Sequence, residues 1–301
     1  MNTKQKEDRA MRYGIYFAYW ANEWNVDYRP YIEKVARLGF DVLEISCAAL
    51  PNMTHNQLVE LRTLAEDNGI SLTAGYGPSA SENLGSDDPA VVDNATRFYT
   101  DILQKLNLLN IPLLGGGVYS YWPVDYSKPI DKPGDWERSV TNVKTVARIA
   151  ADNGVDYCLE VLNRFEGYLL NTAQEAKTFI AQVDEPNVKI MLDTFHMNIE
   201  EDNLIGAIHL AGSDLGHFHV GENNRRLPAA GGLPWQQIGQ ALHDIGYNRH
   251  VVMEPFVLTG GSVGRDIKVW RDMAPGKDEA ALDRDATESV AFLRSTFEDQ
   301  N

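Results

Sequence analysis

Four side chains able to bind a metal ion or move a proton lie near the ends of four successive strand-like segments in the second half of the chain. They are Glu160 in YCLEVLNRFE, Asp193 in KIMLDTFH, His219 in GHFHVGE and Glu254 in VVMEPF. Each interval between them is about the length of one strand-plus-helix repeat. Asp193 and Glu254 also interrupt apolar runs, where an unpaired charge is costly to bury. A cation shared by the four groups removes that cost, so the pattern predicts a divalent-metal site.

Three carboxylates and one imidazole form a hard donor set made mostly of oxygen. Such a set suits Mn²⁺, Mg²⁺ or Co²⁺ better than a thiolate-rich zinc site would. A cation in it can bind neighbouring oxygens of a substrate, polarise a carbonyl and stabilise an adjacent enediolate. Glu160 and Glu254 flank the other two groups in chain order. We therefore expect these two glutamates on opposite faces of a hydroxy-ketone, exchanging protons with its carbon.

The elements that must position these groups alternate regularly between strand and helix. Apolar, β-branched or aromatic runs predict strands at 12–19, 41–47, 71–76, 112–118, 156–162, 188–193, 216–221 and 250–256. Amphipathic stretches such as 28–39, 54–69 and 135–154 predict helices between them. The candidate N-caps are Thr54, Asp135 and Thr172, and the candidate C-terminal glycines are Gly39, Gly69 and Gly154.

Eight such alternations favour a closed (β/α)8 TIM barrel with a parallel eight-stranded sheet. In this fold the functional groups lie at the C-terminal ends of the strands. The alternative, an open doubly wound sheet, usually carries a glycine-rich turn directly after its first strand, and that turn is missing here. We predict a single catalytic barrel domain over 12–301, preceded by a flexible N-terminal tail over 1–11.

Composition narrows the class of partner. The 301 residues include 27 basic and 43 acidic ones, and the net charge of −16 argues against nucleic acid or an anionic membrane as a partner. No apolar run approaches the roughly 18–20 residues of a membrane helix. Cys47 and Cys158 lie in apolar strand-like runs, and no signal-peptide pattern is present. We expect buried, reduced thiols and a cytoplasmic protein.

Further polar and aromatic residues lie near the same predicted rim. His196, Glu166 and Arg225 each follow one of the four groups within a few residues. From the pattern alone, His196 is equally well a loop histidine bonded to backbone, and the other two are solvated loop charges. Trp122 lies in the proline-bearing loop VYSYWPVDY. We expect it to form part of a ligand wall on which a sugar can stack.

Long motifs in consecutive order carry a resemblance to a known family. They are GIYFAYWANEW, VARLGFDVLEIS, CLEVLNRFEGYLLNT, MLDTFHMNIEE, GHFHVGENNRR and VVMEPFV. Over essentially the whole chain from about residue 12, the sequence resembles the ketose 3-epimerases within the xylose-isomerase-like barrels. This family includes D-tagatose 3-epimerase and D-psicose (D-allulose) 3-epimerase. Tyr76 departs from the pattern, at a position that varies within the family and faces the distal end of the sugar.

The resemblance implies reversible epimerisation at C3 of a free ketohexose through a cis-enediolate. The expected pairs are D-fructose with D-psicose and D-tagatose with D-sorbose. It implies one divalent ion per subunit, with Mn²⁺ expected first and Co²⁺ or Mg²⁺ as alternatives, and assembly as a homodimer or homotetramer. The implied metal ligands are Glu160, Asp193, His219 and Glu254, of which Glu160 and Glu254 are also the proton-transfer pair. The implied substrate-binding residues are Glu166, His196, Arg225, Tyr16, Trp24, Tyr76, Gly117, Trp122 and Phe256.

Other functions on the same barrel stay open at this point. An aldose–ketose isomerase would move a proton between C1 and C2. A ketose-phosphate epimerase would need a phosphate-binding cluster after strands 7 and 8, where only NNRR offers basic charge. A metal-dependent nuclease needs more metal ligands. A non-catalytic sugar-binding barrel is the remote alternative, and the presence of both glutamates argues against it.

Overall fold

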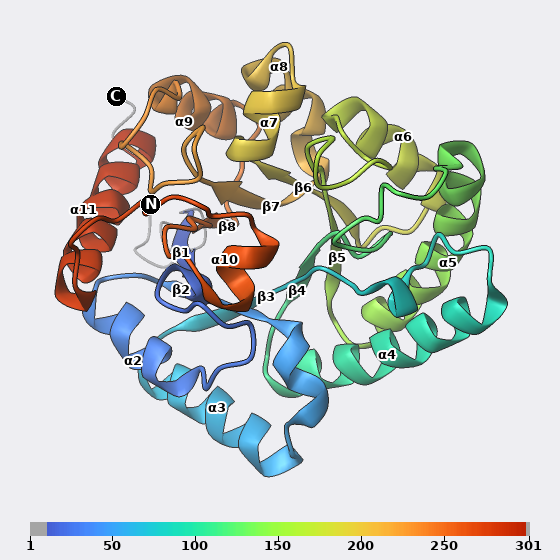
Figure 1. The fold of residues 1–301 in the computed structure, drawn as a ribbon, viewed down its shortest axis with the longest axis horizontal. Coiled ribbons are helices and arrows are strands. Elements are labelled where there is room, and N and C mark those ends of the chain that lie inside the picture. Colours follow the sequence, from blue (N-terminus) through green and yellow to red (C-terminus); the bar gives the residue numbers. More distant parts are fainter. Residues whose placement is uncertain (1–10, 299–301) are drawn as a thin grey trace, which may run out of the picture.

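The computed structural model describes residues 11–298, and within them eight parallel strands close into a barrel surrounded by helices (Figure 1). Each strand pairs with the next one along the chain, and β8 pairs with β1, which closes the sheet. The predicted (β/α)8 barrel is therefore confirmed, and the open doubly wound sheet is wrong. The strands are β1 (Arg12–Tyr16), β2 (Val42–Ser46), β3 (Ser71–Tyr76), β4 (Leu113–Gly116), β5 (Asp156–Glu160), β6 (Val188–Asp193), β7 (Leu215–Val220) and β8 (His250–Met253).

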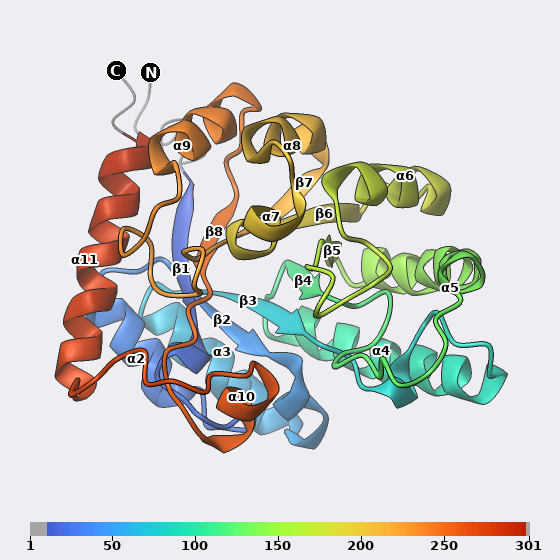
Figure 2. The ribbon, with the colours of Figure 1, turned by 45° about the horizontal axis from the view of Figure 1, so that its top comes forward.

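The helices form the outer layer of the barrel. Figure 2 shows α11 running along the outside of the sheet beside β1, which it contacts. The helices are α2 (Arg29–Arg37), α3 (His55–Asp67), α4 (Pro89–Leu108), α5 (Lys132–Asp152), α6 (Ala173–Val183), α7 (Thr194–Glu200), α8 (Leu204–Ala211), α9 (Trp235–Asp244), α10 (Gly261–Asp266) and α11 (Glu279–Glu298). Short 3-10 helices are η1 (Phe17–Tyr19), η2 (Cys47–Asn52), η3 (Ala80–Glu82) and η4 (Gly212–Asp214).

Two of the three predicted N-caps are confirmed. The side chains of Thr54 and Thr172 accept hydrogen bonds from backbone N–H groups in the first turns of α3 and α6. Asp135 is wrong as an N-cap, because α5 begins earlier and is capped by Asp131. The sequence KPG at the start of α5 resembles a loop, yet proline fits the first turn of a helix. Backbone N–H groups in that turn have no intrahelical acceptor, so the N–H that proline lacks costs no hydrogen bond.

The predicted helix C-termini also hold. Gly39, Gly69 and Gly154 have φ values of 85°, 67° and 71°, the left-handed conformation that glycine adopts at low cost. Cys47 and Cys158 are both buried and free of disulfide bonding, as expected.

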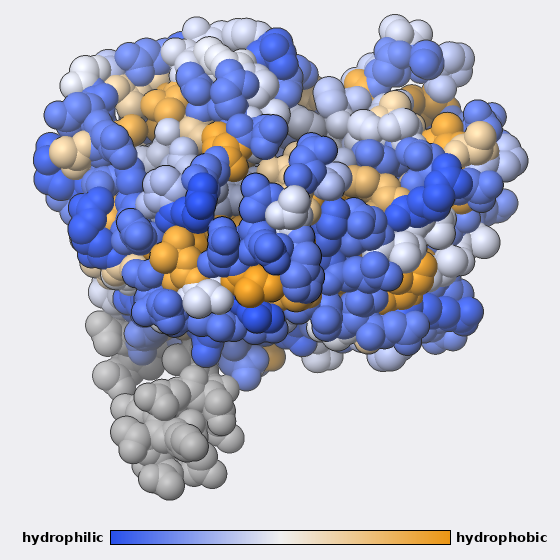
Figure 3. Space-filling view, turned by 90° about the horizontal axis from the view of Figure 1, so that it is seen from below, coloured by the Kyte–Doolittle hydropathy of each residue, from blue (hydrophilic) through white to orange (hydrophobic). Residues whose placement is uncertain are grey.

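The predicted tail falls mostly outside the described residues, since only Met11 of the segment 1–11 is among them. Met11 is buried in the hydrophobic core at the start of β1. On the face drawn in Figure 3, hydrophobic residues occur in small groups among hydrophilic ones. None of the helices described is long and apolar enough to cross a membrane.

The strand ends determine where the candidate site lies. Glu160 and Asp193 are the last residues of β5 and β6, and His219 is the penultimate residue of β7. Glu254 directly follows β8, which is shorter than the strand predicted over 250–256. Proline has no N–H for the sheet, so Pro255 ends the pairing there. All four groups lie at the C-terminal rim of the barrel.

Candidate active site

The structure brings the four metal-binding candidates together at one point. One ligand atom from each of Glu160, Asp193, His219 and Glu254 lies within 4.8 Å of the others. Glu160, Asp193 and His219 are buried, and the Glu254 side chain is 13% exposed. Asp193 uses Oδ1 to accept a hydrogen bond from the backbone N–H of Phe195, which leaves Oδ2 for the cluster.

His219 presents one ring nitrogen to this cluster without a partner. Its Nε2 lies 2.6 Å from Glu44 Oε1 on the other side of the ring. Its Nδ1 is buried, 3.8 Å from Glu254 Oε2, and makes no hydrogen bond to any residue between 11 and 298. A buried nitrogen that faces three carboxylates without a partner fits a divalent cation, to which all four groups would be ligands.

The electrostatics of the cluster also favour a positive charge. Burial and the nearby Glu254 raise the pKa of Glu160 well above its usual range. Burial also opposes ionisation of Glu254, but Arg225 and His219 outweigh it and lower the pKa of that carboxyl. Burial lowers the pKa of His219, yet Glu44 and Glu254 raise it well above the ordinary value. The pKa values of Glu160 and Glu254 are thus shifted in opposite directions, and a cation beside Glu160 would favour its ionised form.

Arg225 connects the cluster to the rest of the cavity. Its Nη2 donates to Glu254 Oε2 at 2.8 Å, and its Nη1 lies 3.3 Å from Glu166 Oε1. The guanidinium carbon lies 4.5 Å from the ring centroid of Phe195 and 4.9 Å from that of Phe256. The residue has a φ of 62°, a conformation that costs energy for any side chain but is common at functional sites.

His196 faces the same cluster with its Nε2. Its Nδ1 accepts from the backbone N–H of Asn163 at 3.2 Å and lies 2.7 Å from the amide nitrogen of that side chain. Nδ1 is therefore an acceptor, so the ring proton lies on Nε2, 3.6 Å from Glu160 Oε1. Burial lowers the pKa of His196, although Glu166 and Asp193 oppose it. The pKa shift favours a neutral ring, which presents a hydrogen-bond donor to the cavity beside the carboxylate cluster. For the same reason the 3.4 Å approach of Arg225 Nη2 to this nitrogen is a contact between two donors.

A cavity of about 290 Å³ opens above the cluster. Its floor is polar and its outer wall is aromatic, with Trp24 making edge-on contacts to Trp122 and Phe256. Every substrate-binding residue expected from the sequence lines this cavity: Glu166, His196, Arg225, Tyr16, Trp24, Tyr76, Gly117, Trp122 and Phe256. The volume suits a small molecule the size of a monosaccharide.

Tyr76 contributes a ring to the wall, but its hydroxyl is already bonded. The hydroxyl donates to Glu82 Oε2 at 2.7 Å, and the ring stacks on Phe98 with centroids 5.0 Å apart. Tyr76 is thereby held by two residues of its own side of the barrel. Its contribution to the cavity is shape rather than a free hydroxyl.

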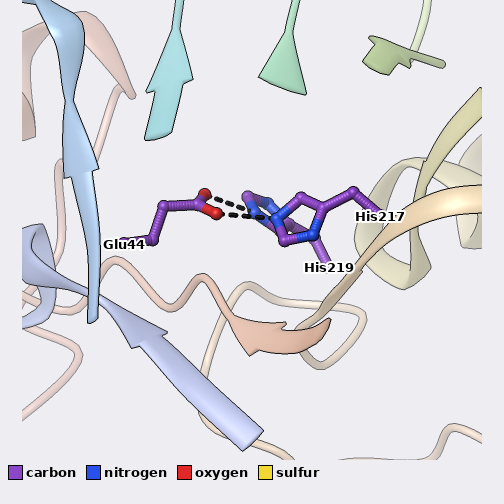
Figure 4. A group of neighbouring side chains, drawn as sticks. All are labelled: Glu44, His217 and His219. Carbon is purple, nitrogen blue, oxygen red and sulfur yellow. Dashed lines mark hydrogen bonds and ion pairs between the residues drawn. The ribbon is translucent and has the colours of Figure 1, made fainter. Parts of the chain in front are cut away.

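Sequence reasoning missed two buried residues beneath the cluster, Glu44 and His217. The carboxylate of Glu44 reaches across the barrel interior to the Nε2 atoms of His217 and His219, each at 2.6 Å (Figure 4). Both signals were present in the sequence. Glu44 is a charge within the apolar run VLEIS, and the alternation in HFH places His217 and His219 on the same face of a strand.

Comparison with known proteins identifies the family. The model of the xylose isomerase-like TIM barrel family matches residues 32–295. The D-psicose 3-epimerase of Ruminiclostridium cellulolyticum is 59% identical, over 96% of this chain and 98% of its own length. That of Enterocloster bolteae is 55% identical, over 97% of this chain and 98% of its own length. This chain belongs to the ketose 3-epimerase family. The resemblance seen in the sequence is therefore confirmed, and the protein is an enzyme of the isomerase class.

Solved structures of ketose 3-epimerases share the whole fold. The structure of a D-psicose 3-epimerase with D-tagatose from Clostridium cellulolyticum H10 has a TM-score of 0.95 at 59% identity, covering 95% of this chain and 99% of that one. A D-psicose 3-epimerase in the presence of D-fructose has a TM-score of 0.94 at 50% identity, covering 95% of this chain and 99% of that one. The barrel described above is thus the fold of the family.

Proposed function

We propose that this ketose 3-epimerase interconverts free ketohexoses at C3, D-fructose with D-psicose and D-tagatose with D-sorbose, with one divalent ion per subunit. The observation that carries the proposal is the pair Glu160 and Glu254, which bring their carboxyl oxygens to one buried point at the C-terminal rim of the barrel. Two carboxyls at one point can act as the acid and the base of a proton transfer, and the opposite shifts of their pKa values favour this division.

The residues that would hold the cation are Glu160, Asp193, His219 and Glu254. When bound, a divalent ion, with Mn²⁺ as our first expectation and Co²⁺ or Mg²⁺ as alternatives, polarises the C2 carbonyl and offsets the negative charge of an enediolate. The three carboxylates and the unpartnered Nδ1 of His219 fit such an ion without any change of residue.

The protein's own groups then carry the proton across C3. In the direction that starts from ionised Glu254, this carboxylate removes the C3 proton and a cis-enediolate forms. Neutral Glu160 delivers a proton to the opposite face of C3, which inverts the configuration. In the reverse direction the two glutamates exchange roles. His196 donates its Nε2–H to a substrate oxygen, and Arg225 and Glu166 orient the end of the sugar nearest C1.

The lining of the cavity favours a free sugar over a phosphorylated one. Among the lining residues within the described part of the chain, Arg225 is the one Lys or Arg side chain, and Glu166 and Glu254 already engage it. A phosphate group would require a further cation or a set of free backbone N–H groups. The aromatic wall formed by Trp24, Trp122 and Phe256 instead suits the apolar faces and the distal carbons of a ketohexose.

We also propose a homodimer or homotetramer in the cytoplasm. Phe165 and Trp270 support a subunit contact, because they are 64% and 75% exposed and large apolar side chains at such exposure are available for burial against a second chain. Light scattering of the purified protein would test the assembly. A monomeric mass at micromolar concentration contradicts it.

Deuterium exchange tests the proton-transfer pair. Glu160→Gln and Glu254→Gln should each abolish epimerisation, because an amide neither removes nor delivers a proton. Incorporation of solvent deuterium at C3 of D-fructose should be lost in the variant that lacks the base facing its C3 proton. The expected loss of kcat is on the order of 100-fold or more. Mass spectrometry and NMR of the recovered ketose measure the exchange, after metal content has been matched between proteins.

The control for this experiment is Glu60→Gln, an exposed carboxyl on α3 outside the cavity, which should exchange deuterium like the wild type. Exchange retained by both active-site variants contradicts the assignment. Chromatography of the products separates the remaining reactions, since an aldose product would indicate an isomerase. Metal-stripped wild-type protein reloaded with Mn²⁺, Co²⁺ or Mg²⁺ and assayed on a panel of ketoses identifies the ion and the preferred sugar.

A further inference from the structure

A buried carboxylate with no direct place in the proposed reaction lies beneath the metal-binding cluster. Glu44, in the middle of β2, is fully buried, and its side chain meets three polar groups. Its Oε1 lies 2.6 Å from His219 Nε2, and its Oε2 lies 2.6 Å from His217 Nε2 and 2.7 Å from Thr73 Oγ1. Figure 4 shows both imidazoles converging on this one carboxylate.

From this geometry we infer that Glu44 is a positioning residue that fixes how His219 meets the metal ion. The inference rests on the proposed metal site. Glu44 Oε1 accepts a hydrogen bond from the Nε2–H of His219, so Nδ1 is the nitrogen left to bind an ion in place of a proton. This nitrogen is buried and faces Glu254 without a hydrogen-bond partner. A carboxylate behind a ligating imidazole holds the ring in one tautomer and orientation and makes the free nitrogen a stronger donor.

The surroundings hold Glu44 itself in place. Thr73 is its register partner on β3 and donates to Oε2, while His217 occupies the same oxygen from β7. On the Oε1 side, a Cβ atom added to Gly75 would lie 3.3 Å from this oxygen, so glycine leaves the space that the carboxylate fills. Both carboxylate oxygens are thus hydrogen-bonded, and these bonds hold the side chain in one conformation.

The same three residues could instead form a second metal site, because Glu44, His217 and His219 also offer ligand atoms close together. Their contacts of 2.6 Å argue against this reading, since they are hydrogen-bond lengths between nitrogen and oxygen. The hydroxyl of Thr73, which donates to Glu44 Oε2, takes up one of the remaining lone pairs. We therefore expect one ion per chain, with Glu44 behind it.

The affinity for Mn²⁺, measured by calorimetry or chelator competition on the full-length protein, tests the inference. Glu44→Gln removes the negative charge and offers one acceptor oxygen in place of two, so the affinity should fall by roughly 10- to 100-fold. Thr73→Val is the matched control, because it removes a hydrogen bond to Oε2 and leaves the contact to His219 untouched. Its Mn²⁺ affinity should stay within about threefold of the wild type.

Several outcomes would overturn the positioning role. One is a Glu44→Gln affinity within about threefold of the wild type, and another is an equal loss in Thr73→Val. Binding of two ions per wild-type chain, with one lost in Glu44→Gln, would show a ligand role instead.

If Glu44→Gln does not fold, ¹⁵N-histidine NMR of the Mg²⁺-loaded wild type decides. His219 should carry its proton on Nε2, and a proton on Nδ1 defeats the inference. A wild type that binds no divalent ion overturns the metal site of the proposed function itself.

Discussion

At the scale of single residues, Arg225 sets both the charge and the shape of the active site. Its guanidinium lies over the rings of both Phe195 and Phe256 and donates a hydrogen bond to Glu254. Burial alone would raise the pKa of Glu254, and the neighbouring charge of Arg225 contributes most to lowering it instead. The arginine thereby favours the ionised form of Glu254, while burial and Glu254 raise the pKa of Glu160.

Replacing Arg225 by methionine should move the pH dependence of catalysis. Arg225 lowers the pKa of Glu254, so its removal should raise that pKa. The carboxylate that acts as the base is then protonated at a higher pH than in the wild type. The acid-side loss of kcat/KM should therefore occur at higher pH than in the wild type. The maximal kcat/KM should also fall, on the order of 100-fold, because the sugar loses an orienting contact. The pH profile of kcat/KM with the metal-loaded protein measures both effects.

Arg226→Met supplies the comparison, since Arg226 is the next residue along the chain and does not line the cavity. Its acid limb should coincide with that of the wild type. An acid limb that stays in place in Arg225→Met would show that Arg225 does not control the ionisation of Glu254.

At the scale of elements, the loop after β8 is fastened over the cavity by the loop after β1. Trp24 Nε1 donates to Asp266 Oδ2 at 2.9 Å, and Ser262 Oγ donates to Glu23 Oε2 at 2.6 Å. Because Trp24 and Asp266 both line the cavity, α10 and the loop after β1 form one wall. Gly261 permits this approach, since a Cβ atom there would lie 1.9 Å from the backbone oxygen of Asn22.

Gly261→Ala should push the two loops apart and displace Trp24 from the wall. The KM for the ketose should rise by about fivefold or more, the equivalent of about 1 kcal/mol for one lost hydrogen bond, while metal affinity stays unchanged. Steady-state kinetics and Mn²⁺ titration measure the two quantities. Gly246→Ala is the comparison, because Gly246 also has a positive φ, does not line the cavity, and its added Cβ would meet nothing within 4 Å. Equal KM values in the two alanine variants would refute a role for the fastened loops.

The elements also show which features a sequence can predict. The four metal-binding candidates were predictable because a barrel brings strand ends together, and this rule needs only the order of strands. Glu44 and His217 lie before the strand ends, and their contact crosses the barrel from β2 to β7. Such a contact depends on the closed shape of the sheet. The fastening of Trp24 to Asp266 depends likewise on two loops at opposite ends of the chain.

At the scale of the whole molecule, the last helix completes the barrel. Arg294 of α11 lies 2.7 Å from Asp41, whose other contacts include the backbone N–H of Tyr13 in β1. Phe297 is fully buried, and a Cβ atom added to Gly239 of α9 would lie 2.7 Å from its ring. The two ends of the described chain are therefore joined by close packing, although they are far apart in sequence.

Phe297→Ala should lower the free energy of unfolding by about 3–5 kcal/mol, because it leaves a cavity between α9 and α11 that the backbone cannot fill. Urea unfolding monitored by circular dichroism measures this change. Leu210→Ala, at a position that is 40% exposed on α8, should change the free energy by only about 0.5 kcal/mol or less. A loss below about 1 kcal/mol in Phe297→Ala would mean that α11 contributes little to the closed barrel.

The polar contacts of Glu44 have a consequence for how the active site could have been assembled from smaller pieces. All four metal-binding candidates lie in or directly after β5 to β8, whereas Glu44 and Thr73 lie in β2 and β3. A half-barrel made of the last four strands would contain every group that can touch the ion, but nothing to orient the imidazole. Affinity for the ion would then depend on contact between the two halves of the barrel. After a cut between β4 and β5, the fragment with β5 to β8 should bind the ion weakly alone and tightly when the other fragment is added.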